Sequence, residues 1–533
     1  MKESIGVILQ WLCIICLATL DVMSQTWLRT YGGSRDDGIG RPSIVTTADG
    51  GFVGCAIVRS YDRDFNTIGP GAFLYKIDRD GSFEWRRKIN SQCTTWVVTM
   101  NKLQDGGFVA AFECYGQAIV VKKFDEEGRE LWVRELHGAL PSDWSPYFGE
   151  MTIVELGNGN IALAGSSDWT GGDFKGLANH GASDVFVVML DKQGNPKWIK
   201  SLGGSKQDDV LSITPSYDNG LLLTGGSYSR DKDIRSKYGN DSNYTRDLFV
   251  VRLQSNGSIE WVRTLGGTGD DVGTAIQTTQ DGGVVVAGWT SSNNGDFSGL
   301  DMGDNDILIT KLDAEGDMQW KRVYGGSLSE VPHAIDVAAN GDLLVTGIAC
   351  SDDGDFKRRY QGSLCVMRLS TNGSMVWKRV VSGDNCNDVG TSIATCSDDG
   401  VVLTGRALST SGDYQGIKRD SSSDIVVIRM DKNGSVSNLT SIPTCQAPLT
   451  TDKSLVCYVH ANTLTIKHDM TAKPLEVVLF NAIGEIVLRR SIQYSEMNGS
   501  TIEIDLTPYS NGLYWISLIN QESHNSAQFT VVR

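Results

Sequence analysis

The stretch that decides the fold begins at Trp261 and reads WVRTLGGTGDDVGTAIQTTQDGGVVVAGWT over residues 261–290. A polar loop with Gly295-Asp296-Phe297 follows, and then an apolar run from Asp306 to the next Trp, Trp320. The same order of features recurs along the chain, and internal repeats of this length are typical of propellers and solenoids. Seven Trp residues, 47 to 66 residues apart, mark the copies: Trp27, Trp85, Trp132, Trp198, Trp261, Trp320 and Trp377.

Each copy contains four short runs of β-type sequence. Asp281-Gly282-Gly283 lies between two apolar runs, and Gly accepts the positive φ that a tight hairpin turn requires. A second hairpin precedes most of the Trp residues, as in Asn256-Gly257. Runs such as Val284-Val285-Val286 are continuously apolar, which predicts strands that are buried on both faces. The copies therefore predict sheets stacked on neighbouring sheets, without periodic helices.

Seven such units predict a closed seven-bladed β-propeller over residues 26–440, because closure removes the exposed sheet edges. In this fold each Trp covers the seam between neighbouring blades. A solenoid is the alternative, although neither end resembles a polar cap. After a linker at residues 441–454, alternating strands at residues 455–533 predict a small β-sandwich, so the whole chain is predicted to be all-β.

The first 24 residues have the layout of a signal peptide. Lys2 supplies a positive charge, residues 5–20 are almost wholly apolar, and cleavage is predicted between Ser24 and Gln25. A membrane anchor is the alternative, but the apolar run is shorter than the roughly 20 residues needed to span a bilayer. We therefore expect an exported chain with no transmembrane segment in its mature form.

The chain is acidic, with 64 Asp and Glu against 48 Lys and Arg in 533 residues, a net charge of −16. This balance argues against a nucleic-acid partner, since neutralising phosphates requires clustered Lys and Arg. Cations, neutral glycans and basic protein surfaces remain compatible with it.

Nine Cys residues remain after removal of the signal peptide. Exported chains can form disulfides, and buried thiols are the alternative. Three pairs are close enough in sequence to be candidate disulfides: Cys93 with Cys114, Cys350 with Cys365, and Cys445 with Cys457.

The propeller is predicted to carry long polar loops on one rim and tight hairpin turns on the other. Function concentrates on loops held by a rigid scaffold, so the rim with the long loops is the predicted binding face. Carboxylates recur there about ten residues after most of the repeat Trp residues, as in Asp270-Asp271. They could form an acidic ring, but their repetition favours a structural role in capping turns near the Gly-Gly pairs.

The Gly-Asp-Phe loops offer further oxygen ligands. Oxygen-rich loops can hold Ca²⁺, so Asp173, Asp296 and Asp355 are candidate ligands and Ca²⁺ is the one cofactor that the sequence suggests. No twelve-residue calcium-loop pattern is present, and the repeated Phe or Tyr is better explained as a plug between blades.

An aromatic patch is the predicted ligand site. The segment between Trp132 and Asn158 is longer than in most copies and places Trp144, Tyr147 and Phe148 on the predicted face, with Trp169 in the neighbouring loop. Aromatic rings beside Asp and Asn suit sugar rings and also protein contacts. A local lid over the blade packing is the alternative.

Catalytic motifs are missing from the sequence. There is no nucleophile elbow, zinc-protease motif or phosphate loop, and His137, His180 and His333 stand at no metal-ligand spacing. We therefore expect a non-catalytic protein that binds a glycan or a surface protein. An extracellular polysaccharide hydrolase or lyase that uses carboxylates of the rim is the alternative.

The hairpin that leads to each Trp resembles the tryptophan-docking motif of quinoprotein propellers. This resemblance implies that the Trp27 strand completes the last blade, otherwise supplied by residues 391–431, as a non-covalent clasp. The final copy has Asn438 where Trp is expected, which agrees with a weak fourth strand of its own. No adjacent Cys pair suggests the redox site of that family.

The tail resembles the type A C-terminal sorting domain of the Bacteroidota type IX secretion system. The resemblance rests on residues 480–487 (FNAIGEIV), 504–506 (IDL), 511–514 (NGLY) and the closing run to Arg533, while the usual Pro-Asn-Pro opening is missing. The propeller is similar to repeat proteins of the same bacteria. The resemblance implies that residues 455–533 engage the type IX machinery and that the protein is secreted or held at the outer-membrane surface. A fibronectin-like accessory domain is the alternative.

Overall fold

The computed structural model divides the chain into two units, Met1–Leu439 and Thr440–Arg533, and each is described by itself. In the first unit it describes residues 26–66, 70–89, 98–114, 118–138, 150–169, 171–177, 180–238, 245–300, 303–356, 362–383, 387–418 and 420–436. In the second it describes residues 455–460, 463–468, 475–481, 486–492, 501–505, 512–519 and 524–531. The predicted signal peptide and linker lie outside these residues.

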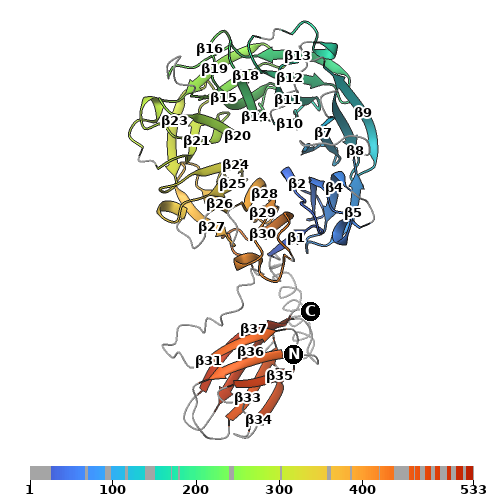
Figure 1. The fold of residues 1–533 in the computed structure, drawn as a ribbon, viewed down its shortest axis with the longest axis vertical. Helices are drawn as coiled ribbons and strands as arrows, with labels where there is room; N and C mark the ends of the chain where they lie inside the picture. Colours follow the sequence, from blue (N-terminus) through green and yellow to red (C-terminus); the bar gives the residue numbers. More distant parts are fainter. Residues whose placement is uncertain are drawn as a thin grey trace, which may run out of the picture. The chain divides into compact units, whose positions relative to one another are not determined.

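Seven four-stranded antiparallel sheets form a ring in the described part of the first unit, which confirms the seven-bladed propeller (Figure 1). Numbered 1 to 7 in chain order, the blades have as innermost strands β2 (Ile39–Thr46), β6 (Val98–Lys102), β10 (Thr152–Glu155), β14 (Asp208–Pro215), β20 (Asp271–Thr278), β24 (Glu330–Val337) and β28 (Val389–Thr395). Their second strands are β3 (Phe52–Val58), β7 (Phe108–Cys114), β11 (Ile161–Ser167), β15 (Leu221–Ser227), β21 (Val284–Thr290), β25 (Leu343–Ala349) and β29 (Val401–Ala407).

The third strands are β4 (Gly71–Ile77), β8 (Ala118–Phe124), β12 (Asp184–Leu190), β18 (Asp247–Leu253), β22 (Asp306–Leu312), β26 (Ser363–Leu369) and β30 (Asp424–Met430). The outermost strands of blades 1 to 6 are β5 (Phe83–Lys88), β9 (Glu130–His137), β13 (Pro196–Leu202), β19 (Ile259–Leu265), β23 (Met318–Tyr324) and β27 (Met375–Val381). A small hairpin of β16 (Arg230–Asp231) and β17 (Ile234–Arg235) lies within blade 4.

Blade 7 is completed by the N-terminal strand β1 (Trp27–Tyr31). It pairs antiparallel with β30, from Trp27 opposite Arg429 to Tyr31 opposite Ile425. The ring is thus closed by backbone hydrogen bonds between the two ends of the propeller, as the clasp interpretation predicted. Trp27, Leu28 and Tyr31 are each at most 6% exposed, so the clasp also belongs to the core.

Each of the seven repeat Trp rings lies on a hairpin turn of the next blade. The turn carries a Gly with positive φ, and a Cβ added to that Gly would lie 2.7–3.1 Å from the indole ring, so only Gly fits beneath the Trp. The indole N–H of Trp261 donates to the carbonyl of Ala314 in the same turn, at 3.1 Å. The pairs are Trp27 with Gly81, Trp85 with Gly128, Trp132 with Gly194, Trp198 with Gly257, Trp261 with Gly316, Trp320 with Gly373, and Trp377 with Gly434.

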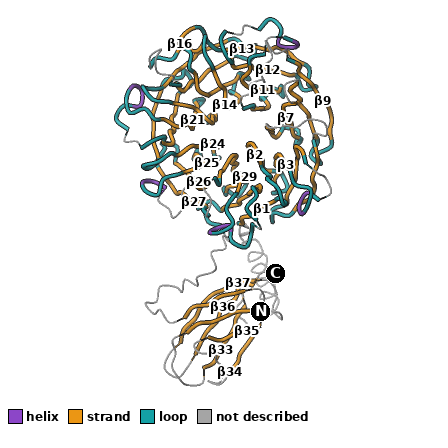
Figure 2. Tube along the Cα trace, viewed as in Figure 1, coloured by secondary structure: helices purple, strands orange, loops and turns teal. Residues whose placement is uncertain are grey.

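Five 3₁₀ segments lie between second and third strands and appear as purple coils around the ring in Figure 2. They are η1 (Arg63–Phe65), η2 (Gly172–Phe174), η3 (Gly295–Phe297), η4 (Gly354–Phe356) and η5 (Gly412–Tyr414). The aromatic residue of each is at most 1% exposed, which confirms its role as a plug. The end of the propeller that carries these segments and the loops before the innermost strands is called the loop rim below.

A pair of buried carboxylates lies at four blade seams, and every member is at most 5% exposed. The second members cap the turns before the innermost strands, as predicted: Asp271 accepts the N–H of Gly267 at 2.8 Å and the hydroxyl of Ser292 at 2.7 Å. The first members start third strands, and each has one oxygen, Oδ1, with no hydrogen-bond partner. The pairs are Asp184 with Asp208, Asp247 with Asp271, Asp306 with Glu330, and Asp424 with Asp37.

The two carboxylates of a pair converge on one glycine. A Cβ placed on Gly266 would lie 2.4 Å from Asp247 Oδ1 and 2.9 Å from Asp271 Oδ2, so the two oxygens are close neighbours. Burial raises the pKa of Asp271 to about 7 and that of Asp247 to about 6, and the charge of Asp247 adds to the rise at Asp271. The seams therefore hold carboxyl groups that keep their protons in mildly acidic solution.

The second unit contains two antiparallel sheets among its described residues. One has the strand order β31 (Leu455–His460), β32 (Thr463–His468), β35 (Thr501–Asp505). The other has the order β34 (Ile486–Ile492), β33 (Leu475–Asn481), β36 (Gly512–Ile519), β37 (His524–Val531). The buried side chains of these strands include Leu464, Val477, Leu479 and Ile504. The β-sandwich stays a prediction.

One predicted disulfide is wrong. Cys350 and Cys365 remain thiols, because Cys365 pairs with Gly347, three residues before Cys350. Three residues of strand separate the two Cα atoms by about 10 Å, beyond the roughly 7 Å limit of a disulfide. Cys114 is disulfide-bonded. Its predicted partner Cys93 lies outside the described residues, as does Cys445, whose pairing with Cys457 stays a prediction.

Two glycine substitutions test how much the contact between a turn glycine and the Trp261 ring contributes to stability. Gly316 has φ +84° and its Cβ would lie 3.0 Å from Trp261, whereas Gly282 has φ +82° and nothing within 4 Å of its Cβ position. Both Gly→Ala variants incur the same backbone strain, but Gly316→Ala should lose about 1–3 kcal/mol more stability because the indole must move. Urea unfolding of the two variants checks this. Equal losses would contradict the docking role of the turn.

The five seam carboxyl groups with the highest pKa predict that stability falls as the pH rises from about 4 to about 8. Their pKa values are about 6 or 7 in the folded chain, against an ordinary value of 3.8. The folded chain therefore binds these protons more tightly, and the stabilisation is complete below pH 3.8 and lost as the pH passes 6 to 7. The melting temperature should fall in the order of about pH 4.5, 6 and 8.

A seam variant provides the control for this pH dependence. In Asp306→Asn the side chain carries no charge at any pH, so the variant should melt higher than the parent at about pH 8 and vary less with pH. Burial lowers the pKa of His333 to about 3, so this residue alone would make stability rise with pH. The five seam carboxyl groups outnumber it, and the net stability should still fall as the pH rises. A melting temperature that does not change with pH would refute the seam assignment.

Candidate functional site in the central channel

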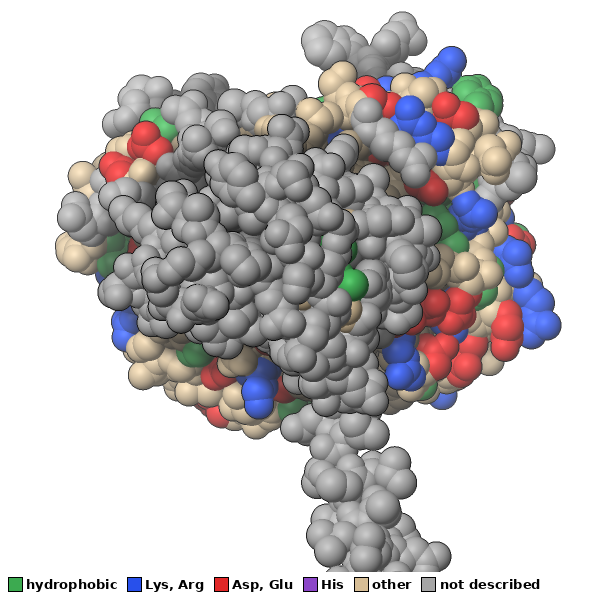
Figure 3. Space-filling view, turned by 90° about the horizontal axis from the view of Figure 1, so that it is seen from below, with side chains coloured by type: hydrophobic (Ala, Val, Ile, Leu, Met, Phe, Trp, Pro, Cys, Tyr) green, Lys and Arg blue, Asp and Glu red, His purple; other side chains and the backbone are tan. Residues whose placement is uncertain are grey.

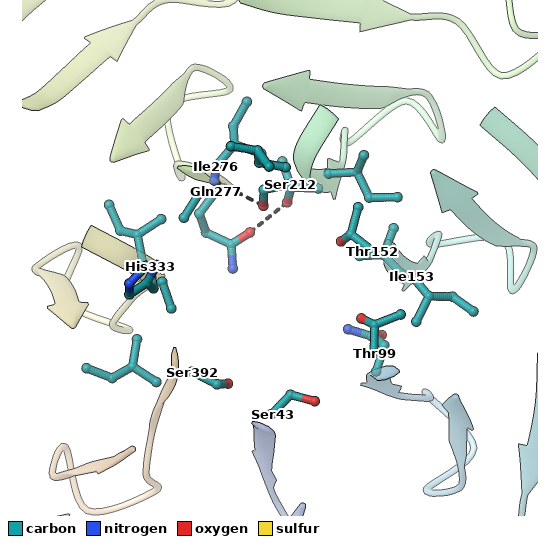
Figure 4. A pocket seen from close by; sticks show the side chains of 18 of the residues that line it. Ser43, Thr99, Thr152, Ile153, Ser212, Ile276, Gln277, His333 and Ser392 are labelled. Carbon is teal, nitrogen blue, oxygen red and sulfur yellow. Dashed lines mark hydrogen bonds between the residues drawn. The ribbon is translucent and has the colours of Figure 1, made fainter. Parts of the chain in front are cut away.

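The innermost strands of all seven blades surround one cavity of about 730 Å³ on the propeller axis. Figure 4 shows side chains from these strands, among them Ser43, Thr99, Thr152, Gln277 and His333, directed toward this open space. The cavity exists because seven sheets of this width cannot meet at the axis.

Hydroxyl groups occupy the same position on five of the seven innermost strands. Each of these residues pairs with the fourth residue of its blade's second strand, and an apolar residue that is buried between blades follows it. Ala275 and Ala334 hold the position in blades 5 and 6. The five hydroxyl residues are Ser43, Thr99, Thr152, Ser212 and Ser392.

Amide and carboxylate groups form a second polar layer along one side of the channel. Thr214 donates its hydroxyl to Oε1 of Gln277 at 2.6 Å, and Nε2 of Gln277 lies 3.4 Å from Asp336. Asp336 in turn accepts the hydroxyl and the N–H of Thr395, both at 2.8 Å. This chain of bonds joins blades 4 to 7 and holds the Gln277 side chain at the channel wall.

An ion pair crosses the loop-rim end of the channel. Nη1 of Arg41, in blade 1, lies 2.5 Å from Oε2 of Glu150, in blade 3, and each side chain is about one-third exposed. Burial raises the pKa of Glu150, Arg41 lowers it, and the nearby charge of Asp209 raises it further. The pair therefore places a donor and an acceptor side by side at the mouth of the channel.

His333 lies in the same end of the channel and is neutral. It is the extra residue of a bulge in β24, because the pairing with β25 skips from Pro332 to Ala334. Burial lowers its pKa to about 3, with a smaller effect from the charge of Arg41. Its Nδ1 is buried without a hydrogen-bond partner, so the ring keeps a polar atom that a bound molecule could satisfy.

The predicted aromatic patch is only partly described. Trp144, Tyr147 and Phe148 lie outside the described residues. Trp169 is 4% exposed, and its ring packs against Phe174 with the centroids 5.1 Å apart. This ring belongs to the interior of the blade seam, so the proposal below does not use it.

The three Asp residues predicted as Ca²⁺ ligands lie in η2, η3 and η4, in blades 3, 5 and 6, and the structure does not bring them together. Each carboxylate accepts a backbone N–H from the end of the preceding blade. For Asp173, Asp296 and Asp355 the donors are His137, Gly266 and Gly325, at 2.8, 3.3 and 3.3 Å. Within the described residues no group of three or more His, Cys, Asp and Glu could hold a metal ion. The Ca²⁺ prediction stays a prediction.

The outer surface carries mixed charge. Figure 3 shows acidic and basic side chains next to one another on the described surface of that view. Ion pairs such as Lys122 with Glu130 at 2.7 Å and Arg129 with Asp125 at 2.6 Å account for part of this mixture. None of the helices in the described residues has the length and apolar character needed to cross a membrane.

The chain is similar in fold to solved structures of low sequence identity. PorZ of Porphyromonas gingivalis, an essential bacterial surface component of the type-IX secretion system, is 12% identical with a TM-score of 0.38, over 94% of this chain and 60% of that one. Puromycin hydrolase is 13% identical with a TM-score of 0.45, over 84% of this chain and 62% of that one. We draw nothing about function from these two likenesses.

A curated relative and a family model complete the comparisons. Regulatory protein FlaEY of Caulobacter vibrioides is 25% identical over 220 residues, which span 40% of this chain and about a fifth (22%) of that protein. Residues 460–533 match the family model described as the secretion system C-terminal sorting domain. The chain is therefore a seven-bladed propeller that carries a type IX sorting domain as its tail, a cargo of that secretion system that is secreted or displayed at the cell surface.

Proposed function

We propose that this exported propeller binds a neutral oligosaccharide in its central channel, at the end where Arg41 and Glu150 meet. The observation that carries the proposal is the lining of the 730 Å³ cavity by hydroxyl and amide groups, with one ion pair at its mouth. Ligand cavities in proteins have volumes of about 300–1,000 Å³, so the channel has room for several sugar rings.

The chemistry of the wall matches that of a sugar. Sugar hydroxyls donate and accept hydrogen bonds, and so do the hydroxyls of Thr99 and Thr152 and the amide of Gln277. A channel of this kind recognises many hydroxyls at once, and it needs no net charge to do so.

The Arg41–Glu150 pair can orient a bound oligosaccharide. Glu150 engages Nη1 of Arg41, which leaves the other N–H groups of the guanidinium for ligand oxygens. A pair of adjacent sugar hydroxyls can accept from Arg41 and donate to Glu150. Hydrogen bonds to charged groups are the stronger ones, typically about 1.5–3 kcal/mol each.

The raised pKa of Glu150 is the observation that favours the second candidate function, a polysaccharide hydrolase or lyase. A carboxyl group whose pKa is raised by burial can act as a general acid on a glycosidic oxygen. The two candidates differ in one outcome, the release of shorter oligosaccharides.

Glu150→Gln should weaken oligosaccharide binding by about tenfold or more, since it removes a charge-assisted hydrogen bond. The measurement is isothermal titration of the full secreted chain with neutral cello-, xylo-, malto- and chito-oligosaccharides. Glu127→Gln is the matched control, because Glu127 also forms an ion pair with an arginine, 2.7 Å from Arg129, on the outer surface. It should leave the affinity unchanged.

Two outcomes would overturn binding in the channel. One is an oligosaccharide that binds the parent and Glu150→Gln equally well. The other is the absence of binding to all four series. Shorter products that appear with the parent and not with Glu150→Gln would instead assign the hydrolase or lyase.

A further inference from the structure

A guanidinium flanked by two aromatic rings stands on the loop rim at the seam between blades 4 and 5. Arg246 directly precedes β18, Tyr228 directly follows β15, and Trp289 is the last but one residue of β21. The guanidinium carbon of Arg246 lies 5.7 Å from the centre of the Tyr228 ring and 5.4 Å from the centre of the Trp289 ring. The three side chains are called the Arg246 platform below.

The backbone fixes this platform firmly. Arg246 donates its N–H to Oδ1 of Asp270 at 2.8 Å, and its carbonyl accepts the N–H of Asp271 at 2.8 Å. These two bonds cross the seam, so the rings of blades 4 and 5 keep their positions relative to Arg246. Such a preorganised surface loses little conformational freedom when a ligand binds.

One nitrogen of the guanidinium has no hydrogen-bond partner among the described residues. This is the buried Nε atom, and Oδ1 of Asp270 is 3.7 Å away. The Arg246 side chain as a whole is 27% exposed, so an outer part of the guanidinium can donate to a partner from outside the chain.

The Arg246 platform and the mouth of the channel both interact with the charge of one residue, Asp209. Asp209 feels the charge of Arg246 on one side, and its own charge raises the pKa of Glu150 on the other. Asp209 is the second residue of β14, and Ser212 of the same strand lines the cavity. A linear ligand can therefore contact the ion pair at the mouth and the Arg246 platform together.

The repeats show that these residues are departures from the common pattern. The position of Trp289 is held by Ile57 in blade 1 and Ile348 in blade 6, each the last but one residue of its second strand. The position of Arg246, directly before the third strand, is held by Ser183 in blade 3 and Asn305 in blade 5. The scaffold does not need an arginine or a tryptophan at these places, so their presence in one seam points to a ligand.

We infer that the Arg246 platform is a second sugar subsite, in which a ring of a neutral oligosaccharide stacks on Trp289 while its hydroxyls accept from Arg246 and donate to Asp270, whose side chain is 36% exposed. The inference rests on the proposed function, because it extends the same ligand beyond the channel. Two carboxylates, Asp209 and Asp270, flank one guanidinium, so the balance of charge disfavours an acidic sugar. Aromatic faces suit the C–H surface of a neutral ring.

The test compares chain lengths. Trp289→Ile, which restores the residue of blades 1 and 6, should weaken the binding of a hexasaccharide by about tenfold and leave that of a disaccharide unchanged. Trp289→Phe should keep part of the hexasaccharide affinity. The probes are cello- and chito-oligosaccharides of two and six units, titrated into the full secreted chain. Tyr61→Ala is the matched control, since Tyr61 also carries an arginine, Arg35, 4.9 Å from its ring centre.

The outcomes separate the subsite from the channel. If Glu150→Gln weakens both lengths while Trp289→Ile weakens neither, the channel stands and the subsite is refuted. If Trp289→Ile weakens both lengths equally, the ring belongs to the channel site and the second subsite is refuted as well. Oligogalacturonate that binds more tightly than the neutral hexasaccharide, and loses this advantage in Arg246→Gln, would overturn the neutral ligand.

Discussion

The fit of an indole ring on a glycine turn is the contact on which the rest of the structure depends. It occurs at all seven seams, and it works because the turn glycine has no Cβ to hold the ring away. The contact lies at the outer edge of the blades, where flat sheets that radiate from an axis would otherwise separate. At four of the seams a pair of buried carboxylates at the loop rim also ties an innermost strand to the blade before it. These four seams are thus held by two kinds of contact, an aromatic contact and a polar network of carboxyl and amide groups.

This division explains which residues are free to serve a ligand. Side chains that recur in most blades, such as Trp261 and Asp271, have their partners within the ring and are accounted for by the fold. Four residues do not recur at the same position of the other blades: Arg41, Glu150, Arg246 and Trp289. Each of them lies where the repeat leaves a polar or apolar surface open. The channel and the loop rim are parts of one surface, since the strands that line the cavity begin at the rim.

Much of the fold could be read from the sequence, because Trp spacing and Asp-Gly-Gly turns are local signals that repeat. The clasp followed from the resemblance of the Trp hairpins to those of quinoprotein propellers, because that alignment leaves the strand of Trp27 without a blade of its own. The hydroxyl layer of the channel also left a signal, a Ser or Thr directly before an Ile or Met in five copies, which becomes meaningful only after the strands are aligned. The ion pair between Arg41 and Glu150 left no signal in the sequence, since it joins two blades that are not neighbours along the chain. Trp169 looked like a surface residue because it lies in a loop, yet that loop folds into the seam. Cys350 and Cys365 looked like a disulfide because sequence distance does not show the register of two strands.

The pairing of residue 27 with residue 429 has a consequence for the order of events in synthesis. Blades 1 to 6 can assemble from neighbouring segments as the chain emerges, but the seventh must wait for a strand made at the very beginning. The first strand therefore stays unpaired, with its hydrophobic side uncovered, for nearly the whole time that a ribosome needs to make the propeller. Closure is a single late event of very high contact order, which makes it slow and open to mispairing between two nascent chains.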